Sequence, residues 1–535
     1  MNIQQAKEEI TNTIKAYLSR DELGNYRIPS LRQRPVLLMG PPGIGKTQIM
    51  EQIAAQTGIG LISYTITHHT RQSAIGLPFI EHRTYDGEDV TVTEYTMSEI
   101  LASVHNLMEK TGIREGILFI DEINCVSETL APMMLQFLQC KTFGNQKLPE
   151  GWIIVAAGNP PEYNKSVRDF DVVTLDRVRR INVEPDFTVW KQYADKKGLH
   201  GAVVSYLDIN KDSFFQIETT ADGLQFATAR GWEDLSELLT TYEQIGIKVS
   251  REVIEEYIQM PSIARDFANY LELYYKYQQI YHVDEILKGS WQKINLIQLQ
   301  DAPFDERIAV MSLILSRLRE DCRRARHLDQ LCVALHEHLL KVRDQAADGA
   351  ACTGVLRELA EQTRRQLRSG MQAGNLDIPT RNAGLRVIHA LEDYQSRLQT
   401  EGVPEKEQFD RLKAYFTQHI AARDQAADLA HTHLDNAFAY LEKAFGDSQE
   451  MVLFVTELTA GEHTSWFIQN FGCDAYFRHN QDLLFEDRRK DLNRQIIQAK
   501  RAEQVQKEEE MSDAELLRAI MTKTEEDNKQ TEGEN

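Results

Sequence analysis

The chain has 535 residues, a formal net charge of −21 and six cysteines. That length exceeds what one hydrophobic core supports, so we expect about two to four domains, and the negative charge disfavours a general attraction to nucleic acid or anionic membranes. No apolar run approaches the ~20 residues that a membrane span needs, the N-terminus lacks the form of a secretion signal, and the cysteines show no metal-binding spacing, so we expect a cytoplasmic protein.

Residues 5–19 have the apolar spacing of an amphipathic helix, and a glycine-rich loop follows the apolar run from Pro35 to Met39. In such a loop, successive backbone N–H groups turn toward a polyphosphate, Lys46 reaches the β and γ phosphates, and the Thr47 hydroxyl can bind Mg²⁺. An ordinary glycine-rich turn is the alternative, but a strand before the loop and a helix after it favour an ATP site (Walker A). The expected ATP-binding residues are Gly40, Pro41, Pro42, Gly43, Ile44, Gly45, Lys46 and Thr47.

A second apolar strand, near residues 116–120, ends in two adjacent carboxylates, Asp121 and Glu122. At the end of a strand Asp121 can face the metal while Glu122 faces the attacking water. This pair is the expected partner of the phosphate loop (Walker B), and it predicts hydrolysis of ATP in addition to binding.

Apolar strands alternate with helices from residue 36 to about residue 185, which predicts an α/β core with a mostly parallel sheet. The strands are expected at 36–39, 60–66, 117–120, 153–157 and 181–183. Two hairpins are expected within this core, one with its turn at Asp86-Gly87 and one at Gly144-Asn145. We expect the first hairpin to project from the core, and the alternative is that both hairpins are surface decorations.

The remainder of the chain has mainly helical patterns. We expect four regions: residues 1–185 as the nucleotide-binding core with its N-terminal helix, 186–278 as a small helical lid, 279–500 as an all-α extension, and 501–535 as an acidic, disordered tail. Within the lid, Pro261 is expected to break a long helix.

Residues 1–278 resemble an AAA+ ATPase of the MoxR family, in the dynein-related, helix-2-insert branch. The resemblance is carried by the phosphate loop, the two carboxylates and three later segments. Asn159 follows a strand where the family has its polar sensor-1 residue, and Arg230, in Thr-Ala-Arg-Gly-Trp, stands at the sensor-2 position. The alternatives are an asparagine favoured by a Gly-Asn-Pro turn and an exposed arginine at a helix start.

The segment Leu175-Asp176-Arg177 resembles the family element whose arginine enters the site of the neighbouring subunit. Arg177 is therefore the candidate arginine finger, which stabilises charge on the γ-phosphate. Val178 stands where phenylalanine is usual, and Arg179 and Arg180 offer competing guanidiniums. Surface salt bridging is the alternative for all three arginines.

The resemblance implies a P-loop AAA+ core, a helical lid, and a hexameric ring that hydrolyses ATP with Mg²⁺ bound by Thr47 and Asp121. It also implies that the protein remodels, matures or assembles other proteins, with a von Willebrand factor A domain protein as partner. Residues 67–78 are expected to form a loop that contacts the client, and their adjacent histidines are a poor metal site. A nucleic-acid translocase and a nucleotide-dependent scaffold stay open as alternatives.

Overall fold

The computed structural model of the chain describes residues 1–68, 72, 74, 76–85, 88–143, 146–163, 167, 170–220, 223–347 and 349–481. Both expected hairpin turns, at Asp86-Gly87 and Gly144-Asn145, lie outside these residues. The same holds for several positions of the expected contact loop at 67–78 and for the acidic tail at 501–535.

A parallel five-stranded sheet forms the centre of the N-terminal half, with strand order β2-β5-β8-β1-β9. Its three central strands, β5, β8 and β1, are almost wholly buried because helices cover both faces, which is why they are near-continuous apolar runs. The expected α/β core is therefore confirmed. The strands are β1 (Val36–Met39), β2 (Gly60–Thr65), β5 (Gly116–Asp121), β8 (Trp152–Gly158) and β9 (Arg179–Asn182).

Helices α1 and α2 pack on one face of the sheet, and α4 and α5 pack on the other. Each face has its own apolar cluster, to which α1 contributes Ile10 and Ile14, and α4 contributes Ile100 and Val104. The helices of this core are α1 (Ile3–Leu18), α2 (Lys46–Thr57), α4 (Glu99–Thr111), α5 (Ala131–Cys140) and α6 (Val172–Arg177), with short 3-10 turns η1 (Ser30–Arg32), η2 (Ile66–His68) and η3 (Ile123–Cys125).

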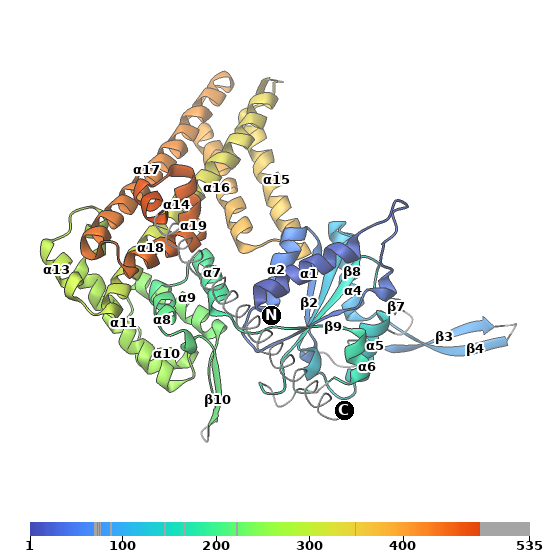
Figure 1. The fold of residues 1–535 in the computed structure, drawn as a ribbon. Coiled ribbons are helices and arrows are strands. Elements are labelled where there is room, and N and C mark those ends of the chain that lie inside the picture. Colours follow the sequence, from blue (N-terminus) through green and yellow to red (C-terminus); the bar gives the residue numbers. More distant parts are fainter. Residues whose placement is uncertain are drawn as a thin grey trace, which may run out of the picture.

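Three two-stranded antiparallel hairpins accompany the sheet. They pair β3 (Pro78–Tyr85) with β4 (Glu88–Tyr95), β6 (Thr142–Phe143) with β7 (Gln146–Lys147), and β10 (Gln216–Thr220) with β11 (Gly223–Ala227). The first and the third project from the body of the molecule (Figure 1). The sequence patterns did not predict the third, which lies between two lid helices; its strand β11 is anchored by the bond from Phe226 N–H to Gln259 O.

The region expected to form the lid contains α7 (Phe187–Lys197), α8 (Gly201–Ile209), η4 (Lys211–Ser213), α9 (Ala229–Ile245), α10 (Arg251–Tyr257) and α11 (Pro261–Tyr281). The expected break lies where α10 ends and Pro261 begins α11, because proline is favoured in the first turn of a helix. Its missing N–H would have had no partner there in any case.

The extension is entirely helical over the described residues, and its long helices lie at the top of Figure 1. Its helices are α12 (Val283–Leu287), α13 (Lys293–Asp301), α14 (Phe304–Ala347), α15 (Cys352–Ala373), α16 (Ile378–Thr400), α17 (Glu405–Phe445), α18 (Gln449–Ala460) and α19 (Glu462–Phe471). The expected fold class, an α/β core with a helical lid and an all-α extension, is confirmed. None of the helices in the described part is long and apolar enough to cross a membrane.

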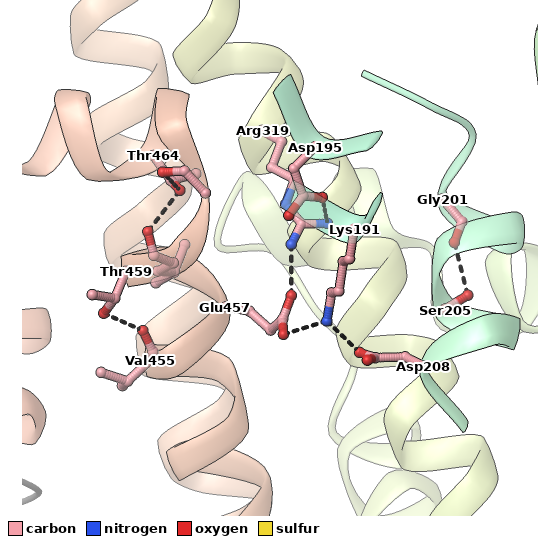
Figure 2. A network of polar contacts seen from close by, with 12 residues as sticks. Lys191, Asp195, Gly201, Ser205, Asp208, Arg319, Val455, Glu457, Thr459 and Thr464 are labelled. Atoms are coloured by element: carbon pink, nitrogen blue, oxygen red, sulfur yellow. Dashed lines mark hydrogen bonds and ion pairs between the residues drawn. The ribbon is translucent and has the colours of Figure 1, made fainter. Parts of the chain in front are cut away.

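Lid and extension share one apolar core, which runs from Trp190 to Tyr476. A partly buried ionic network joins them as well (Figure 2). Lys191 of α7 bonds Asp208 of α8 at 2.6 Å and Glu457 of α18 at 2.5 Å. Arg319 of α14 bonds the same Glu457 at 2.8 Å, and it also bonds Asp195 of α7 at 3.1 Å. The extension is thus built onto the lid, and α15 also reaches back to β2 and α4 of the core.

Candidate active site

The phosphate loop joins the end of β1 to the start of α2, at the carboxyl edge of the sheet. Gly43 and Gly45 have φ values of 76° and 89°, the left-handed region that glycine adopts without steric cost. Gly40 lacks a side chain for a different reason, because a Cβ there would lie 2.7 Å from the carbonyl oxygen of Val183. The loop therefore keeps its backbone tight at the N-terminus of α2, a position that favours an anion.

Lys46 lies inside this loop and is only 8% exposed. Its ammonium group donates to the carbonyl oxygens of Gly40 at 2.9 Å and Pro41 at 2.8 Å, and to Asn159 Oδ1 at 2.9 Å. Burial lowers the pKa of Lys46 to about 8, while the nearby charge of Asp121 acts in the opposite direction. Negative charge on a phosphate would likewise favour the protonated lysine.

Thr47 and Asp121 meet beside Lys46, where the Thr47 hydroxyl donates to Asp121 Oδ2 at 3.1 Å. A hydroxyl and a carboxylate are the hard oxygen ligands that Mg²⁺ takes from proteins, with phosphate and water supplying the rest of its shell. This donor set therefore fits the expected metal. Over the described ranges, no group of three or more His, Cys, Asp or Glu side chains forms an all-protein metal site.

Glu122 has an unusual backbone for its residue type, with φ 56° and ψ 34°. Non-glycine residues in this left-handed region carry strain and cluster at functional sites. One of its carboxylate oxygens, Oε2, accepts a bond of 2.9 Å from the hydroxyl of Thr67. Thr67 follows β2, the strand that pairs directly with the Asp121 strand.

The bond from Thr67 was not predicted from the sequence, which only assigned this residue to a contact loop. The local pattern could not reveal it, because the neighbour relation between β2 and β5 is a property of the sheet. A hydroxyl just after a core strand was the available signal.

Asn159 connects two parts of the site. Its side chain accepts from Lys46, and its backbone oxygen accepts from Asn124 Nδ2 at 2.7 Å. Asn124 is itself buried, and Gly158 accommodates it, since a Cβ on Gly158 would lie 2.5 Å from Asn124 Oδ1. The sequence pattern did not predict a role for Asn124, and the structure places it in contact with the segment of Asn159.

Arg230 lies in the first turn of α9, next to the phosphate loop. A Cβ built on Gly43 would be 3.3 Å from Thr228 Oγ1 and 3.4 Å from the Cβ of Arg230. Thr228 caps the helix by accepting from the N–H of Gly231 at 3.2 Å. Both interpretations of the sequence hold geometrically, because Arg230 is exposed at a helix start and also adjoins the ATP-binding loop.

The three candidate finger arginines differ in their contacts. Arg177 is exposed at the C-terminal end of α6 and donates to Gln139 of α5. Arg179 is held by α1, through Glu9 and through Thr13 Oγ1 at 2.6 Å. Arg180 is exposed and donates to the side chain of Asn182, two residues further along β9, at 2.8 Å.

Thus Lys46, Thr47, Asp121, Asn159 and Arg230 come together around the loop, with Glu122 directly after Asp121. Arg177 lies apart from them, against α5.

Comparison with known proteins identifies this region. Residues 36–175 match the family described as ATPase family associated with various cellular activities (AAA). The matched range begins at β1 and ends within α6, so it contains the phosphate loop, both carboxylates and Asn159. Residues 36–175 therefore form an AAA ATPase domain, and this family supports ATP binding and hydrolysis at the site.

No curated protein matches the chain. Among solved structures, a candidate ATPase from Cytophaga hutchinsonii ATCC 33406 is 15% identical with a TM-score of 0.21 over 34% of this chain. Hsp104 with ATPγS and FITC-casein, in a closed state, is 17% identical with a TM-score of 0.26 over 37% of this chain. The chain spans 46% and 36% of their lengths, respectively.

Proposed function

We propose that the protein is a MoxR-type AAA+ ATPase that assembles into a ring, with a hexamer as the expected form, and couples Mg²⁺-dependent ATP hydrolysis to the remodelling, maturation or assembly of other proteins. A von Willebrand factor A domain protein is the partner that the resemblance implies, the client is unknown, and the cytoplasm is the proposed location. The lid and the extension would convert the state of the nucleotide into movement of the partner.

In the proposed site, Lys46 and the loop amides bind the phosphates, while Thr47 and Asp121 hold Mg²⁺, which would neutralise charge on the β and γ phosphates. Glu122 orients the attacking water and accepts its proton. Asn159 holds the Lys46 ammonium in line with the γ-phosphate, and Arg230 transmits the presence of that phosphate to α9 and the lid.

The position of Arg177 is the observation that best supports the proposed ring. Its guanidinium is exposed on α6, whereas Arg179 is engaged by Glu9 and Thr13 of its own chain. An exposed planar cation beside an ATPase domain is suited to stabilise the γ-phosphate of a neighbouring copy, an effect worth about 10³-fold or more in turnover. Arg180, also exposed, is the matched comparison.

Mixing two inactive variants tests this arrangement. Glu122→Gln removes hydrolysis but leaves the finger, and Arg177→Ala removes the finger but leaves Glu122. Random mixing in equal amounts gives about a quarter of the sites an intact Glu122 and an intact neighbouring Arg177, so activity should return to about that fraction of wild type. Arg180→Ala should retain turnover by itself.

If the mixture stays as inactive as its components, Arg177 does not act between subunits. Sedimentation with ATP and Mg²⁺ provides the accompanying measurement of ring size.

Client capture tests the remodelling role. The Glu122→Gln protein should accumulate bound to ATP and assembled, so its co-purifying proteins, identified by mass spectrometry, are compared with those of Lys46→Ala, which lacks the phosphate-binding lysine. Proteins enriched only with Glu122→Gln are candidate partners. Each is then purified and added back, and ATP-dependent change in its fold or assembly is measured; no change in any of them contradicts the proposal.

The charges on the β3–β4 hairpin disfavour the nucleic-acid alternative. Arg83 is neutralised there by Glu81 at 2.8 Å and by Glu94 at 3.1 Å. A hairpin that tracks a phosphate backbone would need unpaired cations. Stimulation of turnover by single-stranded DNA or RNA would reverse this conclusion. A scaffold without turnover is inconsistent with the ATPase assignment, and loss of turnover in Glu122→Gln with ATP binding retained would exclude it directly.

A further inference from the structure

A cluster of arginines and histidines lies outside the ATP site, where α14 meets α16 and α19, close to the C-terminal part of α7. We call it the arginine–histidine cluster. Arg326 of α14 contacts His463 of α19 at 3.4 Å, and the rings of His327 and His463 are 6.1 Å apart. The members are Arg323, Arg326, His327, Arg386 and His463; all are half-buried, and the other four lie close enough to His327 for their charges to act on it.

One carboxylate, that of Glu462, balances several positive charges here. It accepts from Arg326 at 2.8 Å and also from Lys196 of α7 at 3.1 Å. Among the described residues, neither Arg323 nor Arg386 has a hydrogen-bonding or ion-pair partner. Arg323 lies over Gly198, the residue that ends α7, since a Cβ there would lie 2.2 Å from its Nη1 atom.

This shortage of carboxylates is unusual within the chain. One turn earlier on α14, Arg319 is bonded to Asp195 at 3.1 Å and to Glu457 at 2.8 Å (Figure 2). On α16, Arg397 bonds Asp393 at 3.5 Å. A protein with a net charge of −21 has abundant acids to pair with partly buried arginines, and a guanidinium left half-buried without a counter-ion is costly.

The lowered pKa values of the two histidines are consistent with a positive potential in the cluster. Burial lowers the pKa of His327 to about 4, and the charges of Arg386, His463, Arg323 and Arg326 act in the same direction. Burial and the charge of Arg326 also lower the pKa of His463, which Glu462 partly offsets. Both rings are therefore neutral near pH 7, where they can still donate one hydrogen bond each.

We propose that the arginine–histidine cluster is a binding site for a small phosphate-bearing anion, with Arg323 and Arg386 as its principal ligands. Two guanidiniums offer the forked N–H pairs that match phosphate oxygens, and the half-buried setting strengthens such charge-assisted bonds. The bound anion would join α16 to α14, close to the lid helix α7. This site is independent of the proposed ring and of the client.

Pyrophosphate binding measured by titration calorimetry on the full chain tests the proposal. All proteins carry Lys46→Ala, so that the phosphate loop contributes little. In this background Arg386→Gln and Arg323→Gln should each weaken binding about tenfold or more, because each removes a charge-assisted bond. The matched controls are Arg381→Gln on the same helix as Arg386, and Arg324→Gln beside Arg323; both arginines are exposed and should be replaceable without effect.

Parallel titrations with inorganic phosphate and AMP distinguish an inorganic ligand from a nucleotide. Proton uptake is the second readout: a bound anion raises the pKa of His327 toward its ordinary value, so binding near pH 5.5 should take up protons, and His327→Gln should remove most of that uptake. Equal affinities of Arg386→Gln and Arg381→Gln would overturn the proposal. So would a melting temperature of free Arg386→Gln well below that of Arg381→Gln, since loss of an unbalanced cation should not destabilise the protein.

Discussion

At the scale of single residues, Glu122 Oε2 accepts a hydrogen bond of 2.9 Å from the hydroxyl of Thr67. In the proposed site, that donor competes with the attacking water for the same carboxylate oxygen. We expect Thr67→Val, which keeps the shape and removes the hydroxyl, to raise basal ATP turnover about fivefold, the equivalent of about 1 kcal/mol for one hydrogen bond.

The KM for ATP should stay unchanged, because in the described part of the chain the Thr67 hydroxyl bonds Glu122 and not the phosphate loop. Thr67→Ser, which retains the hydroxyl, should behave like wild type. A fall in turnover with Thr67→Val would instead make Thr67 a residue that positions Glu122 for catalysis.

Lys141 is a second residue whose environment has a measurable consequence. It is 2% exposed, its ammonium group bonds Gln33 Oε1 at 3.3 Å, and burial lowers its pKa to about 8. Below pH 8 the folded protein therefore buries a charge that the unfolded chain exposes to water. Between pH 8 and the ordinary lysine value the unfolded state holds the extra proton, so this contribution makes the protein more stable as pH rises.

Lys141→Met should consequently stabilise the core at pH 7 by about 1–2 kcal/mol, after allowing for the lost bond to Gln33. The gain should be smaller at pH 9.5, where the native lysine is already mostly neutral. Thermal unfolding of both proteins at pH 7 and pH 9.5, in buffers of equal ionic strength, measures the gain in stability at each pH. An equal gain at both would show that packing of the methionine, and not loss of charge, is responsible.

At the scale of elements, the parallel strands and the phosphate loop could be predicted from the sequence because their causes are local. A strand buried on both faces must be a short apolar run, and a loop that encloses phosphate needs glycine where φ is positive, as at Gly43 and Gly45. Adjacent carboxylates at a strand end likewise identified Asp121 and Glu122.

What could not be predicted depends on contacts between distant segments. The β10–β11 hairpin is short, and it is fixed by the bond between Phe226 and Gln259 outside its own strands. The engagement of Arg179 by Glu9 and Thr13 depends on α1 packing beside β9, far away in sequence. For the same reason Arg177, Arg179 and Arg180 appear equivalent in the sequence and differ in their contacts in the fold.

At the scale of the whole molecule, the extension contacts both the lid and the central sheet. Through Glu457 and the shared apolar core it is fixed to the lid. Through the turn that follows α15 it also rests on the central sheet, because a Cβ on Gly374 would lie 2.7 Å from the carbonyl oxygen of Leu61 in β2. Figure 1 shows these helices descending toward the core beside α2. Movement of the lid on the nucleotide must therefore bend this second connection or lift it from β2.

Gly374→Ala tests whether this contact protects the sheet edge. The added methyl group meets the Leu61 carbonyl and should displace the turn, so amide hydrogen exchange in β2 should become faster, by about tenfold for an opening made easier by about 1.4 kcal/mol. Gly374 also has a positive φ of 68°, which strains alanine wherever it stands. Gly402→Ala controls for that strain, since Gly402 has φ 60° and no heavy atom within 4 Å of its added Cβ. Faster exchange in β2 with Gly374→Ala alone supports a connection between extension and core, whereas equal exchange in both variants would mean that the turn merely lies against β2 without holding it.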